Sequence, residues 1–337
     1  MTMGIAPPRA ERTWSLFGLR LRSAHVFENR LTPDRGQPDL RFAYVDHDPI
    51  APGWEGLAPA YASPNLVDDD QPWLAVFRTP ACTVLHFGGV ATFFLFDDRI
   101  ACRVLDPAYA YMVELHLLGY VLSLWLELRG VLMLHAAAVE VDAHAVGFLA
   151  TNKGGKTSLA ASLMQLGHPL VSDDIVPLET ELGGAVARPG YPQMRMWPDQ
   201  AALFAGPIER LETVHPRLEK RRVPTGPGAF GTFTQAERLP LACLYLPQRV
   251  VGAPIEIAAL STATSLVTAT EHSFAVGIVE GLGLEVERFG RLAHLIRHVP
   301  IRRLTYPDGV EHLPAVRSAV LEDVRRLLEA ARGVDAR

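Results

Sequence analysis

Residues 147–176 read GFLATNKGGKTSLAASLMQLGHPLVSDDIV, and this stretch decides the fold. An apolar run leads into a glycine-rich loop that ends in Gly155-Lys156-Thr157. The residues after Thr157 repeat apolar side chains at helical spacing, and Gly167 is a suitable C-cap. HPLVSDD then predicts a short strand that ends in two acids. The order strand, glycine-rich loop, helix and strand is typical of a nucleotide-binding α/β unit.

The loop resembles the phosphate-loop pattern G-x-x-x-x-G-K-[ST], except that Ala150 occupies its first position. Backbone N–H groups of such a loop form a cradle for anions at the start of the following helix. The first glycine can be replaced where φ is negative, and alanine is the smallest replacement. We therefore expect nucleotide binding by Thr151, Asn152, Lys153, Gly154, Gly155, Lys156, Thr157 and Ser158.

The chemistry of the loop is concentrated in its last two residues. Lys156 is expected to bridge the β- and γ-phosphates, and Thr157 to supply a hydroxyl to Mg²⁺. Lysine and arginine together number 32, and only three of these residues are lysines. Two of the three lysines lie in this loop. Their retention indicates that a compact ammonium group is required at position 156.

Two acids, Asp173 and Asp174, follow the loop lysine after 17 and 18 residues. Adjacent carboxylates can divide the work of phosphate transfer, one holding the metal and the other taking a proton from a hydroxyl. Neighbouring side chains of an extended strand point in opposite directions, so both can serve only where the strand ends and bends. An N-cap or a solvated turn is the alternative. His135 lies 21 residues before Lys156, in an earlier predicted strand. It is either a core residue or part of the site.

Composition and charge exclude several classes of protein. The chain has 337 residues, 49% hydrophobic and 20% charged, with a net charge of −5. These values fit a globular protein in water and argue against a nucleic-acid partner. The three cysteines have no paired spacing, so the reducing cytoplasm is the expected location. The apolar stretch 113–134 is interrupted by charges and predicts a buried helix rather than a membrane span.

The chain divides into three predicted parts: a loose N-terminus at 1–12, a β-rich unit at 13–128 and an α/β domain at 129–332. The first unit contains the β-rich runs WSLFGLRLRS, WLAVFRT, CTVLHF and ATFFLF and closes with a helix from Tyr109 to Arg129. Either it only packs, or it recognises a substrate or leader segment. The α/β domain includes a Pro/Gly-rich stretch at 183–235, helices within 262–298 and a final helix at 315–332.

A basic cluster lies within this Pro/Gly-rich stretch. Its candidate residues for gripping phosphate or an acidic peptide are Arg195, Lys220, Arg221 and Arg222. A solvated surface is the alternative reading of such a charge run.

The segment from Leu134-His135 to Asp174 resembles the kinase domain of HPr kinase/phosphorylase. That family has a strand histidine, a phosphate loop, G-H-x-L-V and an Asp-Asp pair in this order, as in Gly167-His168-Pro169-Leu170-Val171 of this chain. The resemblance implies a phosphoenolpyruvate-carboxykinase-like α/β fold that uses ATP and Mg²⁺. It implies Asp174 as general base, Lys156 and Thr157 on phosphate and metal, and His135 beside the reacting phosphate.

Two features differ from the bifunctional enzymes of that family. The family's R-G-x-G segment, which carries a further metal-binding acid, is replaced by PGYPQMRMWPDQ, where Asp199 is a candidate by distance along the chain only. The N-terminal unit also differs from theirs. The chain is more similar to HPr-kinase-related proteins of ribosomal peptide biosynthesis, such as the lasso-peptide serine kinases.

Three functions follow as hypotheses. The first is a Mg-ATP-dependent kinase that phosphorylates a serine of a peptide or small protein, with Asp174 as base. The second is a kinase of the same fold acting on the hydroxyl of a small metabolite. The third is a nucleotide-binding regulatory module without turnover, which the replacement at Ala150 suggests. No membrane partner is expected, and homo-oligomerisation is left open.

Overall fold

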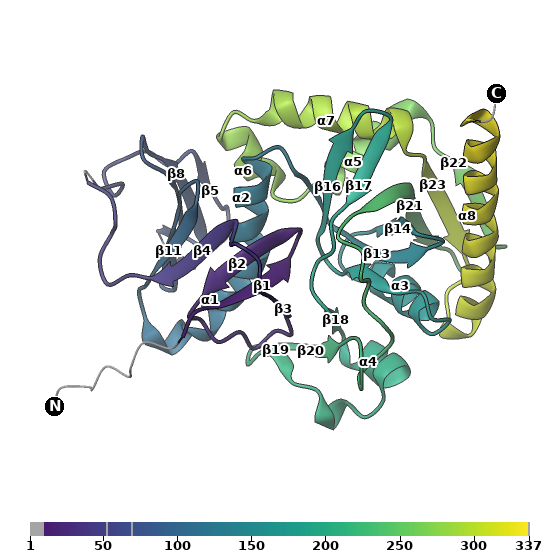
Figure 1. Cartoon of the computed structure of the whole chain (residues 1–337), viewed down its shortest axis with the longest axis horizontal. Helices are drawn as coiled ribbons and strands as arrows, with labels where there is room; N and C mark the ends of the chain where they lie inside the picture. The colour runs from purple at the N-terminus through teal and green to yellow at the C-terminus, as the bar shows by residue number, and fades with distance from the viewer. Residues whose placement is uncertain (1–9, 52, 69, 336–337) are drawn as a thin grey trace. The chain divides into compact units, whose positions relative to one another are not determined.

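The computed structural model describes residues 10–51, 53–68 and 70–335, and the chain forms two compact units (Figure 1). Unit 1 comprises Met1–Trp125 and Gly277–Leu284, and unit 2 comprises Leu126–Val276 and Glu285–Arg337. The sequence placed this division between residues 128 and 129 and assigned the short segment in unit 1 to the second domain. Both units combine sheets and helices, so the protein is of the mixed α/β type.

Unit 1 is built on a nine-stranded sheet in the order β3-β1-β2-β4-β11-β10-β9-β8-β5. The predicted β-rich runs supply β1, β2, β8, β9 and β10, whereas β3, β4, β5 and β11 lie outside these runs. The strands are β1 Arg12–Leu16, β2 Leu19–Ser23, β3 Thr32–Asp34, β4 Leu40–Tyr44, β5 Tyr61–Ala62, β8 Leu74–Arg78, β9 Thr83–Phe87, β10 Ala91–Leu95 and β11 Arg99–Val104. Strand β4 pairs in parallel with β2 and β11, and the other neighbours are antiparallel. A small hairpin is formed by β6 Leu66–Asp68 and β7 Gln71–Pro72.

The predicted helix after β11 is present, and its buried acid Glu114 has partners. A short 3₁₀ turn at Pro107–Tyr109 precedes α1 Tyr111–His116, a π-helical turn Leu117–Val121 and α2 Leu122–Glu127. The buried carboxylate of Glu114 accepts hydrogen bonds from the His25 ring and the Asn29 backbone. Among the described residues, no helix is both long and apolar enough to cross a membrane. Helix α6 (Val276–Gly281) lies almost wholly in unit 1.

Unit 2 is built on a second nine-stranded sheet, which runs β12-β16-β17-β21-β14-β13-β15 and adds β23 and β22 beside β21. Strands β13 and β14 form a hairpin before the glycine-rich loop, and its turn residues Asp142 and Ala143 have positive φ angles of 48° and 59°. The strands are β12 Leu132–Leu134, β13 Ala136–Val141, β14 His144–Leu149, β15 Leu170–Ser172, β16 Val176–Glu181, β17 Gly184–Ala187, β21 Leu239–Arg249, β22 Glu256–Ala259 and β23 Ile301–Tyr306.

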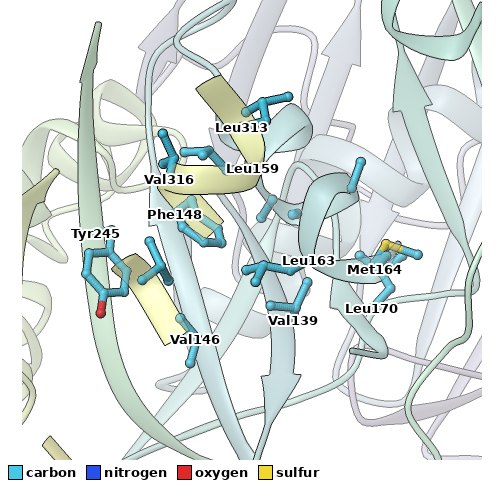
Figure 2. Packing of buried hydrophobic residues seen from close by; sticks show 14 of the residues in the cluster. Val139, Val146, Phe148, Leu159, Leu163, Met164, Leu170, Tyr245, Leu313 and Val316 are labelled. Atoms are coloured by element: carbon cyan, nitrogen blue, oxygen red, sulfur yellow. The ribbon is translucent and has the colours of Figure 1, made fainter. Parts of the chain in front are cut away.

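Helices cover both faces of this sheet, which explains why its central strands are apolar on both sides. Helices α3 (Lys156–Met164) and α8 (Leu313–Asp335) pack on one face, where Phe148, Leu159 and Val316 meet (Figure 2). Helices α5 (Thr262–Glu271) and α7 (Glu285–His298) contribute to the apolar cluster on the other face. The glycine-rich loop therefore sits between a fully buried strand, β14, and a helix anchored in the core.

The Pro/Gly-rich stretch 183–235 contains helices and strands. Strands β18 (Gln193–Met196), β20 (Leu218–Pro224) and β19 (Thr213–His215) form a three-stranded sheet in that order. Helix α4 (Pro198–Ala205) follows β18, and a 3₁₀ turn (Ile208–Arg210) precedes β19; a similar turn, Val310–His312, precedes α8. This small sheet carries the predicted basic cluster.

Candidate active site

The glycine-rich loop presents unpaired backbone donors at the start of α3. Two of its residues, Lys153 and Gly155, have positive φ angles of 63° and 95°. Over the described residues, no hydrogen bond engages the backbone N–H groups of Lys153, Gly155, Lys156 and Thr157. The N-terminus of a helix with free N–H groups attracts anions. The loop thus fits the phosphate groups of a nucleotide.

Ala150 fits the loop because the residue next to its methyl group, Gly154, has no side chain. Its φ is not positive, as required for the replacement of the first glycine, and its side chain is buried. A Cβ atom added at Gly154 would lie 2.6 Å from the Ala150 Cβ. The alanine methyl therefore occupies space that Gly154 leaves open, and the loop closes without the first glycine.

Gly155 is held in place by conformation and by Tyr306. Its φ of 95° is unfavourable for other residues, and an added Cβ would lie 2.7 Å from the Tyr306 hydroxyl oxygen. Burial raises the pKa of Tyr306 to about 12, so this hydroxyl keeps its proton. Arg249 supports the same loop, because its Nη2 donates to the Lys153 carbonyl at 2.7 Å.

We predict that Gly155→Ala costs more stability than a matched substitution and also weakens nucleotide binding. The control is Gly167→Ala, because Gly167 has φ of 94° and open space around its Cβ position. The control should lose about 1–2 kcal/mol from the left-handed backbone alone. Thermal unfolding should show a larger loss in Gly155→Ala, partly recovered by Tyr306→Phe. Equal losses in the two glycine variants would contradict the role assigned to Tyr306.

The two acids face the loop because the chain bends between them. Asp174 follows the end of β15 and has a φ of 71°, a left-handed conformation rare outside glycine, asparagine and aspartate. The bend allows both carboxylates to approach the loop. The Thr157 hydroxyl donates to Asp173 Oδ1 at 3.1 Å, and the Arg195 backbone N–H donates to Asp173 Oδ2 at 2.9 Å. Thr157 and Asp173 offer the hard oxygen ligands that Mg²⁺ prefers.

Asp174 lies beside two cations and the His135 ring. Its carboxylate oxygens are 3.7 Å from Lys156 Nζ, 3.8 Å from Arg195 Nη1 and 3.6 Å from His135 Nδ1. Burial pushes its pKa upward, but Arg195, Lys156 and His135 together hold the pKa below its ordinary value. Burial and the neighbouring carboxylate instead raise the pKa of Asp173. The neighbouring acids thus differ, and Asp174 is the one held as a carboxylate.

His135 is part of the site. Lys156 Nζ donates to His135 Nε2 at 3.0 Å, which makes this nitrogen the acceptor and leaves the proton on Nδ1, facing Asp174. The His135 backbone N–H donates to the His272 carbonyl at 2.7 Å. Burial and the Lys156 ammonium lower the pKa of His135, so the ring stays neutral. It holds the lysine ammonium beside Asp174.

We predict that His135 titrates below the ordinary histidine pKa of about 6.5. Asp174 raises this pKa, so Asp174→Asn should lower it further. Because the folded-state pKa is the lower one, the contribution of His135 to stability falls as the pH drops below about 6.5. An NMR titration of the ring protons, assigned with His135→Asn, measures both shifts. A higher pKa in Asp174→Asn would contradict this geometry.

Some predicted residues are not brought into the cluster. Asp199 is exposed in the first turn of α4 and, over the described residues, makes no hydrogen bond or ion pair with Asp173 or Thr157. Arg222 pairs with Glu212 and donates to the Val214 carbonyl. Within the parts of the chain described, no cluster of three or more His, Cys, Asp or Glu could hold a metal.

Strand alternation divides the basic cluster. Met196 is opposite Arg221 and Arg195 is opposite Arg222 in the β18–β20 pairing, so Arg221 lies on the face opposite to Arg195. Lys220 shares the face of Arg195 and Arg222. The Ser158 hydroxyl already has a protein partner, because it accepts a hydrogen bond from Gln200 Nε2 at 2.8 Å.

The comparisons with known proteins yield one similar solved structure and no similar sequence. No family model matches the sequence, and no curated protein matches it. Among solved structures, the Hpr(Ser) kinase/phosphatase from Coxiella burnetii is similar over 58% of this chain and 98% of that chain, with 13% identity and a TM-score of 0.32.

Proposed function

We propose that unit 2 is a Mg-ATP-dependent kinase that transfers the γ-phosphate to a serine hydroxyl of a peptide or small protein. One observation carries the proposal: the glycine-rich loop and the acid pair are joined by two contacts. Thr157 hydrogen-bonds to Asp173, and Lys156 lies 3.7 Å from Asp174. A phosphate bound to the loop would thus lie between a metal-binding acid and a carboxylate able to take a proton.

The residues would divide the reaction as follows. Mg²⁺ held by Thr157 and Asp173 would neutralise negative charge on the phosphates. Lys156 and the loop N–H groups bind the β- and γ-phosphates and stabilise charge in the transition state. Asp174 accepts the proton of the acceptor hydroxyl, whose oxygen forms the new bond to phosphorus as the bond to the β–γ bridging oxygen breaks and ADP leaves. His135 positions Lys156.

The acceptor class rests on the sequence resemblance. The proteins of ribosomal peptide biosynthesis that this chain resembles phosphorylate a serine of a precursor peptide, so a precursor such as a lasso peptide is the proposed substrate. A kinase of this kind is expected to work in the cytoplasm, where ATP and the precursor are made.

In the experiment, the purified protein is incubated with Mg²⁺, γ-labelled ATP and a pool of serine peptides. The pool includes any short precursor peptide encoded beside the gene of this protein. Label on a peptide serine, absent without Mg²⁺, is the expected result. Label on small metabolites only would favour a metabolite kinase. Nucleotide binding without transfer to any acceptor would favour a regulatory module and overturn the kinase proposal.

A further inference from the structure

Every lysine of this chain lies at the candidate site. Lysine and arginine number 32 in total, and the three lysines are Lys153, Lys156 and Lys220. Lys153 belongs to the glycine-rich loop and Lys220 to β20, far apart in the sequence. The same indole ring lies beneath both side chains: Nζ of Lys153 is 4.9 Å and Nζ of Lys220 is 5.4 Å from the centre of the Trp197 ring.

The fold explains why these three residues meet. Met196 is opposite Arg221 in the antiparallel β18–β20 pair, so Trp197 continues this register toward Lys220. Trp197 is the N-cap residue of α4, where its backbone N–H donates to Gln200 Oε1 at 3.2 Å. This bond holds the Trp197 backbone at the junction of a strand and a helix. The ring lies beside the loop, in contact with Lys153.

Neither ammonium group has a carboxylate partner of its own. Across the described residues, Nζ of Lys153 and Nζ of Lys220 make no hydrogen bond and no ion pair. Both ammonium groups lie within 5.4 Å of the same ring centre, so two positive charges are gathered around one indole. An indole face attracts a cation but does not cancel its charge. An oxyanion between the two ammonium groups would cancel this charge and accept hydrogen bonds from both.

The position of Lys220 indicates which anion would bind. Lys220 lies on the same face of the β18–β20 pair as Arg195, whose Nη1 is 3.8 Å from Asp174 Oδ2, so its side chain is on the side of this small sheet that contacts the acid pair. The acceptor hydroxyl must contact Asp174 under the proposed function. The nucleotide phosphates already have the loop N–H groups and Lys156. An anion at Lys220 would therefore belong to the molecule that brings the hydroxyl.

We propose that Lys153, Trp197 and Lys220 form a second anion-binding site, which holds a carboxylate or phosphate group of the acceptor next to its reacting hydroxyl. This inference rests on the proposed function for the identity of the acceptor, but the anion site itself does not depend on turnover. It defines the acceptor class as a hydroxyl with an acidic group beside it, such as a serine flanked by aspartate or glutamate.

The test titrates the full chain with inorganic phosphate, with and without saturating Mg²⁺ and a non-hydrolysable ATP analogue, and follows indole fluorescence. The expected result is one saturable change that persists with the analogue bound and disappears in Trp197→Phe. Lys220→Gln should weaken phosphate binding at least about 10-fold, as expected for the loss of a charge-assisted hydrogen bond. Lys220→Arg should retain most of it.

The matched control is Arg210→Gln, which removes one exposed positive charge from the same region outside this cluster and should leave phosphate affinity unchanged. Absence of saturable binding in the wild type, or an equal loss in the control, would overturn the inference. Loss of phosphate binding on addition of the analogue would do so too, since the site would then serve the nucleotide. Failure of the analogue to bind overturns the proposed function instead, and the nucleotide-free comparison of Lys220→Gln with Arg210→Gln still decides the anion site.

A second arm compares serine peptides that carry Asp or Asn beside the serine. The wild type should prefer the acidic peptide at least about 10-fold in kcat/KM, and Lys220→Gln should lose the preference. Equal use of both peptides by the wild type would overturn the acceptor assignment.

Discussion

Asp174→Asn is expected to lower the rate of phosphate transfer by about 10²–10⁴-fold, the usual contribution of a general base. The amide has the same shape as the carboxylate but cannot take the proton of the acceptor. Asparagine also tolerates the left-handed backbone at this position, where φ is 71°. The loop and the acid at Asp173 should therefore remain in place, and nucleotide affinity should change little.

Single-turnover transfer and nucleotide titration measure the two effects separately. Asp173→Asn is the informative control, because that carboxylate accepts from the Thr157 hydroxyl and is the proposed metal ligand. Its loss should raise the Mg²⁺ concentration needed for half-maximal rate, which Asp174→Asn should not do. If both variants had the same metal dependence, the division of labour between the two acids would be wrong.

Lys156→Met should have the second large effect, a fall in turnover of about 10²–10³-fold, as for loss of a donor that stabilises transition-state charge. Methionine preserves much of the length and apolar stem but removes the ammonium. That ammonium is almost fully buried, 3.0 Å from His135 Nε2 and 3.7 Å from Asp174 Oδ1. A buried, tetrahedral donor in this position interacts with a phosphate placed over the loop.

Lys156→Arg tests the geometry rather than the charge. The guanidinium is planar and larger than the space between His135 and Asp174, so arginine should recover little of the activity. Steady-state kinetics and nucleotide affinity of both variants provide the measurement. Full activity in the arginine variant would mean that position 156 supplies only charge, and that the compact shape of the ammonium has no role in catalysis.

Local sequence order predicted the centre of unit 2 well. The hairpin, loop, helix and short strand within 136–172 are local elements whose limits are set by glycines and turn residues. The requirement that the chain bend at the acid pair was also predicted, and Asp174 meets it with its positive φ. These features depend on neighbours in the sequence, so the sequence contains their signals.

The supporting residues could not be predicted, because their role depends on long-range pairing. Tyr306 reaches Gly155 only because β23 pairs with β21, and Arg249 reaches Lys153 from the end of β21. Trp197 meets Lys220 through the β18–β20 register, within the Pro/Gly-rich stretch 183–235. Asp199 was chosen by distance along the chain alone, which says nothing about where a side chain lies.

The measurement that tests the central claim most directly is a calorimetric titration of the wild-type protein with a non-hydrolysable ATP analogue, with and without Mg²⁺. The proposed nucleotide site predicts one binding event per chain, tighter with Mg²⁺, and clear weakening in Lys156→Met. Absence of binding under both conditions, in a protein shown to be folded, would mean that the loop at Gly155-Lys156-Thr157 is a structural turn and would contradict the proposed kinase.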